Sequence, residues 1–349
     1  MAKADAGGLE TPFSEPPALG EAVQIAPDLM WMRLPLPMAL DHVNVYALRD
    51  PDGWTIVDTG IDTRKGRAIW EGILDGPLAG APLRRVLVTH HHPDHIGLAG
   101  WMQKTHGAEL LTTRTAWLFA RMLQLDEQPV PSEEAIDYWR RAGMAAEEIE
   151  ERKAERPFNF ADTVAALPLG FTRLRDGQGI CLGGRDWTVR FGQGHAPDHA
   201  VLFADDGSMV LAGDHYLPTI SPNLGVYATE PEADPVAEWL ESHRSLEPYL
   251  TDGQIALPGH GLPFRGLPAR ARALIANHIG ALDRLEAHLS EPRTALECFQ
   301  TIYKREIGRG EFILALVEAM AHCLALWHSG RATRTLRDDG AWLWQAKEV

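Results

Sequence analysis

The chain has 349 residues, of which 45% are hydrophobic and 23% charged, and this composition predicts a folded protein of about two domains. Its 33 basic and 48 acidic residues give a formal net charge of −15, which argues against a nucleic acid or an anionic membrane as the main partner. The three cysteines are far apart and form no CxxC pair, so a disulfide framework and a thiolate zinc site are disfavoured and a cytoplasmic location is expected. No apolar run approaches the ~18 residues of a membrane span.

The first third of the chain alternates between strand and helix patterns. Residues 1–20, rich in Gly, Pro and Glu, predict a flexible arm. Two apolar runs on either side of a PDG turn then predict a β-hairpin. The expected elements are that hairpin over 43–60, a helix over 64–74, a buried strand over 84–90, a helix over 95–105 and a strand over 108–113. This order favours an α/β sandwich, and we expect a first domain over 21–266.

Two helical regions complete the predicted organisation. Residues 114–165 predict a helical insertion, after which strands resume over 171–214. From residue 267 to 349, three helices (269–289, 294–304 and 311–328) precede a hairpin that turns at Asp339–Gly340, which is the outline of a winged helix. Several side chains of the insertion could form an apolar wall of a substrate pocket, with packing inside the insertion as the alternative: Trp117, Phe119, Met122, Tyr138 and Trp139.

A dense group of metal-binding residue types follows the strand predicted over 84–90. His90, His92, Asp94 and His95 form the pattern H-x-H-x-D-H. His90 and His92 are two residues apart, so in extended chain they project to the same side, and a turn after Pro93 brings the other two close. Imidazole and carboxylate groups suit zinc, iron or manganese. The spacing therefore predicts a metal site at the end of this strand.

Three later residues are candidates for completing the metal shell. His195 lies in GQGHAPDH, Asp214 in LAGDHY and His260 in LPGHG. Each follows an apolar run and has a glycine beside it, which allows the backbone to approach an ion and turn sharply. An aspartate can place one oxygen on each of two ions and bridge them.

Together these motifs, with VDTG at 57–60 upstream, resemble the metallo-β-lactamase superfamily over roughly residues 22–265. The resemblance implies an αββα sandwich with a dinuclear metal site at one edge of two packed sheets. His90, His92 and His195 would bind the first metal, and Asp94, His95 and His260 the second. Asp214 would bridge the two, and Asp58 would hold the ligand loop by hydrogen bonds. The tail resembles that of hydrolase-like members that end in a small winged helix.

The sequence also departs from parts of that superfamily. The β-lactamases proper usually have Cys or Ser where Asp214 stands, so Asp214 argues against them. The ligand set resembles that of hydroxyacylglutathione hydrolases, although the C-terminal residues resemble no glutathione-binding patch. Asp198 stands where many members have glycine.

The resemblance implies a metal-dependent hydrolase that holds two divalent ions, with zinc favoured over iron or manganese. A metal-bridging hydroxide would attack a thioester, ester or lactone carbonyl of a small acyl substrate, with Asp94 orienting it and moving a proton. Three alternatives stay open: a phosphodiesterase or nuclease, a single-iron persulfide dioxygenase, and a regulator with a degenerate catalytic domain. No nucleic acid or membrane is expected as a partner, and the C-terminal domain is expected to act as a scaffold or as the contact of a homodimer.

Overall fold

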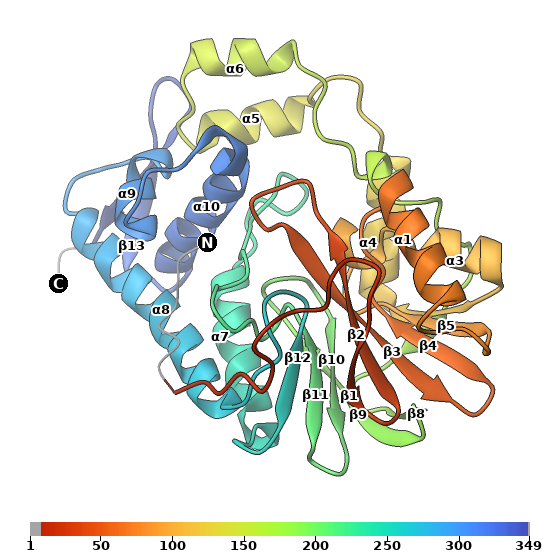
Figure 1. Cartoon of the computed structure of the whole chain (residues 1–349). Coiled ribbons are helices and arrows are strands. Elements are labelled where there is room, and N and C mark those ends of the chain that lie inside the picture. Colours follow the sequence, from red (N-terminus) through yellow and green to blue (C-terminus); the bar gives the residue numbers. More distant parts are fainter. Residues whose placement is uncertain (1–7, 348–349) are drawn as a thin grey trace.

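The computed structural model describes residues 8–347, and at its centre two β-sheets pack face to face (Figure 1). The larger sheet has seven strands in the order β1 to β7, antiparallel from β1 to β4 and parallel from β4 to β7. Its strands are β1 (Val23–Ala26), β2 (Leu29–Pro35), β3 (His42–Asp50), β4 (Gly53–Val57), β5 (Leu83–Leu87), β6 (Glu109–Thr113) and β7 (Thr172–Leu174).

The smaller sheet has five strands in the order β12-β11-β10-β9-β8. β11 and β12 are parallel, and the other neighbours are antiparallel. Its strands are β8 (Gly179–Leu182), β9 (Arg185–Gly192), β10 (His199–Ala204), β11 (Met209–Gly213) and β12 (Ile255–Pro258). It follows from these directions that β9, β11 and β12 all end at the same edge.

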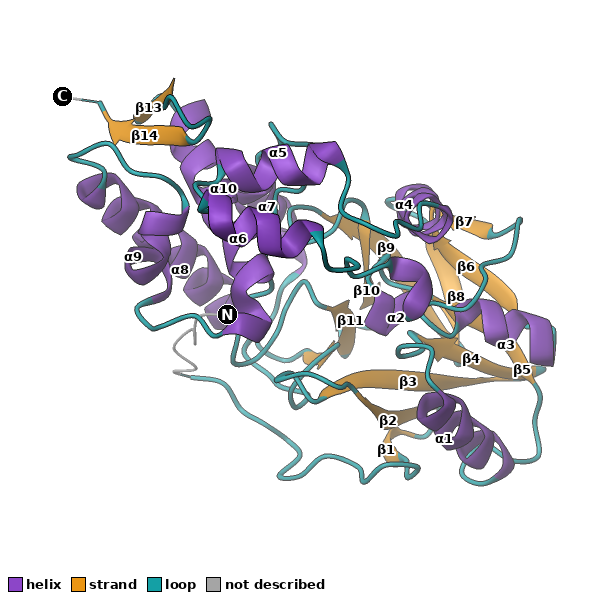
Figure 2. Cartoon of the chain, turned by 90° about the horizontal axis from the view of Figure 1, so that it is seen from above, coloured by secondary structure: helices purple, strands orange, loops and turns teal. Residues whose placement is uncertain are grey.

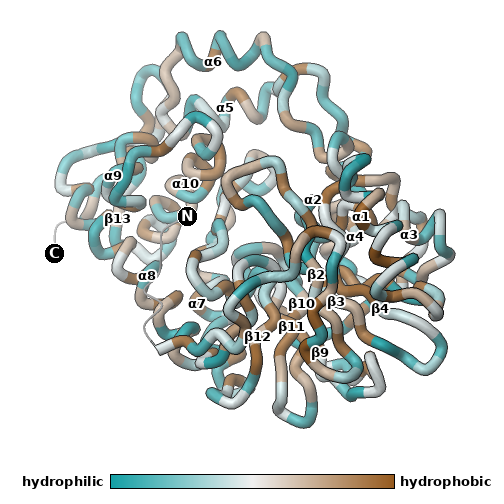
Figure 3. The backbone as a smooth tube through the Cα atoms, in the orientation of Figure 1, coloured by the Kyte–Doolittle hydropathy of each residue, from teal (hydrophilic) through white to brown (hydrophobic). Residues whose placement is uncertain are grey.

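The sandwich forms because strands of both sheets carry apolar residues on both faces. In β3, Val43, Val45 and Ala47 pack against one hydrophobic cluster, while Tyr46 and Leu48 pack into the cluster between the sheets. This is the period-2 alternation of a strand buried on both sides. In Figure 3 the hydrophobic residues accordingly gather on the strands, whereas the outlying helix α6 (Ala146–Lys153) is mostly hydrophilic.

Helices cover the outer face of each sheet, which confirms the predicted αββα sandwich (Figure 2). The larger sheet packs against α1 (Arg64–Asp75), α3 (Ala99–His106) and α4 (Arg114–Leu125), and the smaller sheet packs against α7 (Pro235–Leu246) and α8 (Leu267–His288). The other helices before the C-terminal region are α2 (Pro93–Ile96), α5 (Glu133–Arg141) and α6.

The C-terminal region consists of helices α8 (Leu267–His288), α9 (Phe299–Tyr303) and α10 (Phe312–His328) and a hairpin of β13 (Ala332–Leu336) and β14 (Trp342–Ala346). The helix predicted over 294–304 is shorter than expected: a 3₁₀ turn precedes α9, and Lys304 ends it in a left-handed conformation. Residues Ala142, Met144 and Ile149 of the insertion pack into the same core as α8 and α10. The second half of the insertion therefore covers the C-terminal helices, while α4 covers the larger sheet.

The apolar helix α10 and the N-terminal arm differ from what the sequence predicted. The segment Arg309–His328 does reach the length and hydropathy of a membrane span, although 67% of its apolar window is buried against the rest of the protein. Burial against α7, α8 and α9 explains its apolar character as that of a core helix. Of the arm predicted over 1–20, residues 1–7 lie outside the described residues, and Glu10 forms a β-bridge with Arg265.

Candidate metal centre

The seven predicted metal-binding residues and Asp58 come together at one edge of the sandwich. Each follows a strand whose carboxyl end reaches that edge. Asp58 follows β4, the H-x-H-x-D-H cluster follows β5, His195 follows β9, Asp214 follows β11 and His260 follows β12. Residues from opposite ends of the catalytic domain thus meet because their strands share one direction.

The first group of donor atoms comes from His90, His92 and His195. One nitrogen from each of these rings lies within 4.8 Å of the others. His90 Nε2 and His92 Nδ1 are 3.0 Å apart. Two nitrogens on one tetrahedral ion, with bonds of about 2.0–2.1 Å, are about 3.3 Å apart. The spacing of this group therefore fits three ligands of a single ion.

The second group comes from Asp94, His95 and His260, whose donor atoms also lie within 4.8 Å of one another. Asp94 Oδ2 is 3.6 Å from His95 Nε2 and 3.3 Å from His260 Nε2. Asp94 is the more open member, with 19% of its side chain exposed, while His95 and His260 are buried. This group can hold an ion that still faces solvent on the Asp94 side.

Asp214 lies between the two groups. Its Oδ2 is 3.5 Å from His195 Nε2, in the first group, and 3.3 Å from His260 Nε2, in the second. Its Oδ1 is 3.4 Å from His95 Nε2. A single carboxylate is therefore within reach of ligands from both groups, which is the geometry that a bridge between two cations requires.

The donor atoms fit metal ions rather than an internal hydrogen-bond network. His95 Nε2, His195 Nε2 and Asp214 Oδ1 are buried and have no hydrogen-bond partner among residues 8–347. Buried polar atoms normally have a hydrogen-bond partner, so these three atoms without one require an explanation. A Cβ on Gly259 would lie 2.1 Å from Asp214 Oδ1, so only glycine leaves room for the carboxylate there. A divalent cation bound by imidazole and carboxylate would satisfy all three atoms.

Asp58 orients two of the imidazoles. Its Oδ2 accepts hydrogen bonds from His95 Nδ1 (2.8 Å) and from the Thr89 hydroxyl (2.9 Å), and its Oδ1 accepts from the Thr89 amide (2.8 Å). Thr89 Oγ1 in turn lies 3.0 Å from His90 Nδ1. These contacts leave Nε2 of His95 and His90 turned toward the centre, and hydrogen bonds of this kind set the orientation of metal-binding histidines.

His42 supports His260 and Asn44 supports the loop around it, and neither residue was predicted from the sequence. His260 Nδ1 donates to the carbonyl of His42 (2.7 Å), and the Gly261 amide donates to His42 Nε2 (2.9 Å). Asn44 Nδ2 donates to the carbonyls of Pro258 and Gly261 (both 2.9 Å). The sequence holds one signal of this role: His42 and Asn44 are polar residues two positions apart in an apolar strand, so their side chains lie on the same face.

Burial and charge give the imidazoles of the centre different pKa values. Burial, together with neighbouring imidazoles, lowers the pKa of His90 and of His92 well below the usual value. Burial also acts to lower the pKa of His95 and His260, but the Asp214 and Asp94 carboxylates outweigh it. The pKa of His95 is raised well above normal and that of His260 to about 10. Without metal, the second group therefore holds protons that the first group lacks.

The other histidines near the motifs have supporting positions. His199 is fully buried and its Nε2 accepts a hydrogen bond from the Asp214 amide (3.1 Å). His215 is equally buried, next to Trp239 and His243. His91 turns away from the centre toward Phe119, with ring centroids 5.2 Å apart. None of these three rings is exposed enough to contact a substrate directly.

Asp198 adopts a left-handed conformation, with φ of 51°. That conformation favours glycine and is tolerated by Asp and Asn among other residues. The Asp198 carboxylate accepts hydrogen bonds from the Thr115 hydroxyl and from Gln193 Nε2, the latter at 3.0 Å. It thereby ties the start of α4 to the loop that carries His195.

The aromatic residues of the insertion divide between two roles. Tyr138 is buried and its hydroxyl donates to the Val226 carbonyl (2.7 Å). Trp139 packs against the same core, and Trp117 stacks on Phe171. Of the five, Phe119 lies beside His91, and Met122 is 44% exposed on α4. Packing therefore explains three of the five residues predicted as an apolar wall.

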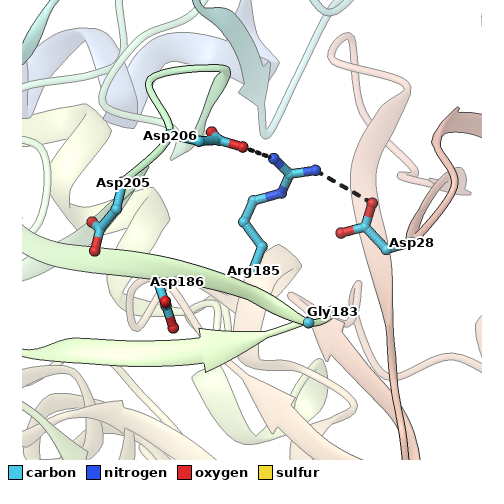
Figure 4. A pocket seen from close by; sticks show the side chains of 7 residues that line it. Asp28, Gly183, Arg185, Asp186, Asp205 and Asp206 are labelled. Atoms are coloured by element: carbon cyan, nitrogen blue, oxygen red, sulfur yellow. Dashed lines mark hydrogen bonds and ion pairs between the residues drawn. The ribbon is translucent and has the colours of Figure 1, made fainter.

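A separate surface hollow, formed by turns of both sheets, is built around Arg185 (Figure 4). Arg185 pairs with Asp206 on the β10–β11 turn and with Asp28 on the β1–β2 turn (3.4 Å). Asp205 and Asp186 point away from the guanidinium in Figure 4. The ion pairs of Arg185 connect the two sheets at the end of the strands opposite the donor cluster.

Comparison with known families matches nearly the whole chain. Residues 38–286 match the model of the metallo-β-lactamase superfamily, and residues 282–347 match the model of the metallo-β-lactamase-like C-terminal domain. The first match contains all of the donor residues described above.

Individual relatives agree with these matches. A crystal structure of a β-lactamase domain protein from Burkholderia ambifaria is 35% identical, has a TM-score of 0.91, and covers 98% of this chain and 99% of its own. A metallo-β-lactamase family protein from Thermus thermophilus is 28% identical with a TM-score of 0.77, over 93% of this chain and 100% of its own. A probable metallo-hydrolase of Bacillus subtilis (strain 168), YqjP, is 25% identical over 84% of this chain and 91% of that protein.

Proposed function

Because the chain belongs to the metallo-β-lactamase superfamily, whose members bind divalent metals, we propose that it is a dinuclear hydrolase of carbonyl esters, thioesters or lactones. The observation that carries this proposal is the position of Asp214, within 3.5 Å of imidazoles from both donor groups. In a mononuclear centre, Asp94, His95 and His260 would form a buried polar cluster with no bound ion, which is costly in stability. Residues of both groups are present in full.

Each residue of the centre has a defined task in this proposal. His90, His92 and His195 would hold the first ion, Asp94, His95 and His260 the second, and Asp214 both. Zinc is the metal that this donor set suits best, with iron or manganese as the alternatives. When bound, the ions supply a water of lowered pKa and polarise the substrate carbonyl.

Asp94 would handle the proton in this proposal. It is the most exposed carboxylate of the centre, and Oδ2 already faces His95 and His260. Its carboxylate can accept a hydrogen bond from the attacking water, hold the proton that the water loses, and deliver it to the departing alkoxide or thiolate. Asp58 and Thr89 meanwhile hold His95 and His90 in one orientation.

The surroundings favour a small acyl substrate over a polyanion. Leu118 and Met122 are 51% and 44% exposed on α4, and α4 begins at the Thr115–Asp198 contact beside the His195 loop. Exposed apolar side chains of this kind suit an acyl or aromatic group. A net charge of −15 repels a polynucleotide before contact, whereas a neutral ester is unaffected.

The similarity of the donor set to that of hydroxyacylglutathione hydrolases supports placing thioesters and esters first among the acyl substrates. The cysteines Cys181, Cys298 and Cys323 are free thiols in the structure, which supports a cytoplasmic setting for the reaction.

A comparison of substrate classes tests the proposal. We would measure kcat/KM of zinc-loaded protein on aryl esters, thioesters, lactones and bis(p-nitrophenyl) phosphate, with Asp214→Ala as the control for adventitious metal. We expect turnover of at least one acyl class to exceed phosphodiester turnover by tenfold or more. Phosphodiester turnover tenfold above every acyl substrate would assign the chain to the nuclease branch instead. Sulfite formation from a glutathione persulfide by an iron-loaded protein, without hydrolysis, would assign it to the dioxygenases.

A further inference from the structure

The hydrogen-bond partner of His195 comes from a different part of the fold than the partners of His90, His95 and His260. His195 Nδ1 donates to the backbone carbonyl of Asn223 (2.9 Å), which leaves Nε2 free for a metal ion. The partners of His90 and His95 come from the loops that follow β4 and β5, and the partner of His260 comes from β3. Asn223, in contrast, lies in an irregular segment, residues 221–227, between β11 and α7.

The C-terminal helices hold this irregular segment in place. Asn223 Nδ2 donates to the Leu314 carbonyl (3.0 Å) and to Glu318 Oε2 (3.2 Å), both on α10. The Val226 amide donates to the Val317 carbonyl (3.1 Å), also on α10. At the start of the segment, the hydroxyl of Ser221 lies 2.8 Å from Nε2 of His278, on α8. The carbonyl that orients His195 is thus fixed by the C-terminal region.

Glu318 is the side chain that is hardest to explain by packing alone. It is only 7% exposed, in a helix whose other residues from Ala315 to Leu326 are also buried. Burial raises its pKa to about 7. A buried carboxylate costs stability that an apolar residue at the same position would not. Its Oε2 accepts hydrogen bonds from the Tyr303 hydroxyl (3.1 Å), in the core of the C-terminal region, and from Asn223 Nδ2. Glu318 therefore connects that core to the residue that contacts His195.

We propose that Glu318 is a positioning residue of the metal centre, which acts through Asn223 to hold the carbonyl that orients His195. The C-terminal region is then part of the metal centre and more than a scaffold. This inference rests on the proposed metal centre, and it concerns the first ion, the one that His195 would bind.

Metal affinity tests this link without relying on activity. We would titrate Zn²⁺ against a chromophoric chelator, and record the visible spectrum of the Co²⁺-loaded protein, for wild type, Glu318→Ala, Asn223→Ala and the double variant. We expect each single variant to lose about 10–100-fold in affinity for one equivalent of metal, the usual effect of removing such support. The double variant should lose no more than the larger single effect, because both residues act through one path.

Two further variants separate positioning from stability. Glu318→Gln keeps a carbonyl oxygen that can accept from Asn223, so it should restore most of the affinity and the Co²⁺ spectrum. Leu316→Ala removes a fully buried side chain from the same helix and should lower the melting temperature without changing metal affinity. If Glu318→Ala does not fold, Asn223→Ala and Glu318→Gln still carry the comparison.

The outcomes distinguish this inference from the proposed function. Wild-type protein that binds two equivalents, with unchanged affinity in Glu318→Ala or Asn223→Ala, would overturn the positioning role alone. An equal loss of affinity in Leu316→Ala would also overturn it, because general destabilisation would then explain the effect. Wild-type protein that binds no metal would overturn the metal centre itself, and this inference with it.

Discussion

At the scale of single residues, Asp214 is the position on which the dinuclear proposal depends most. Two dications a few ångströms apart repel each other, and a shared carboxylate offsets that repulsion. We expect Asp214→Ala to lose at least one equivalent of metal and more than 100-fold in kcat/KM. Metal analysis and turnover of the purified variant would check this, with Asp186→Ala, an exposed aspartate of β9, as the matched control. Metal content and turnover near wild type would show that Asp214 is no bridge.

Protonation of His95 and His260 makes a second residue-scale prediction. Their raised pKa, about 10 for His260, means that both rings carry a proton at pH 7 in the metal-free protein. A metal ion needs the neutral ring, so binding to the second group should release up to two protons, and its affinity should rise with pH up to about 10. Binding to His90 and His92, whose pKa values are lowered, should release none from those rings.

Zinc titration calorimetry in buffers of different ionisation enthalpy would measure these protons. We expect one equivalent of zinc whose apparent enthalpy depends strongly on the buffer. Identical enthalpies in all buffers would mean that His95 and His260 are already neutral and that the Asp214 and Asp94 carboxylates do not charge them.

Asp198 allows a prediction about stability. Its left-handed backbone is strained for most residues, and its side chain accepts two hydrogen bonds. Asp198→Ala keeps the strain and loses both bonds, so we expect a loss of about 2 kcal/mol in the free energy of unfolding. Asp198→Gly relieves the strain and should cost about 1 kcal/mol less. Chemical denaturation of both variants would check the order, and an alanine variant as stable as the glycine variant would contradict it.

At the scale of elements, the C-terminal hairpin has little free positive charge. Arg331 pairs with Asp283 and Glu286, and Arg337 pairs with Asp339. Arg334 pairs with Glu232 and lies over the rings of Trp327 and Trp342. A protein that binds duplex DNA needs several unpaired cations to neutralise phosphates, and these three arginines are already paired.

We therefore expect no sub-micromolar binding of duplex DNA by the full-length protein at physiological salt. Fluorescence anisotropy with a labelled duplex at several salt concentrations would test this. Tight binding with a steep dependence on salt concentration would contradict it, and Arg334→Ala, which removes the central cation of the hairpin, would then show whether the hairpin carries the contact.

The sequence predicted most elements because their patterns are local. The hairpin over 43–60 consists of two apolar runs around a PDG turn, the strand over 84–90 is a short apolar run, and the structure has β3, β4 and β5 there. The donor residues could be assigned to one edge because they follow strands and stand beside glycines. The roles of His42 and Glu318 could not be predicted in this way. His42 contacts His260 and Glu318 contacts Asn223, and both pairs are more than 90 positions apart in the chain. No local sequence pattern encodes such a contact.

At the scale of the whole molecule, three hydrophobic clusters build the fold: one between the two sheets and one on the outer face of each sheet. The loops after the strands supply the seven donors, and helix α10 binds Asn223, whose carbonyl accepts the hydrogen bond of His195. The insertion links the two outer clusters, since α4 packs with the larger sheet and α5 and α6 pack with the C-terminal helices. In Figure 1, α5 and α6 accordingly lie on the side of α10, and loops connect them to the side of α4.

The number of metal ions per chain decides between a dinuclear and a mononuclear centre. Purified protein would be freed of metal, reloaded with zinc, iron or manganese, and analysed for bound metal per chain after removal of excess. We expect two equivalents, with zinc bound most tightly, and one equivalent in Asp214→Ala. A single tightly bound iron with no second metal in the wild-type protein would contradict the dinuclear centre.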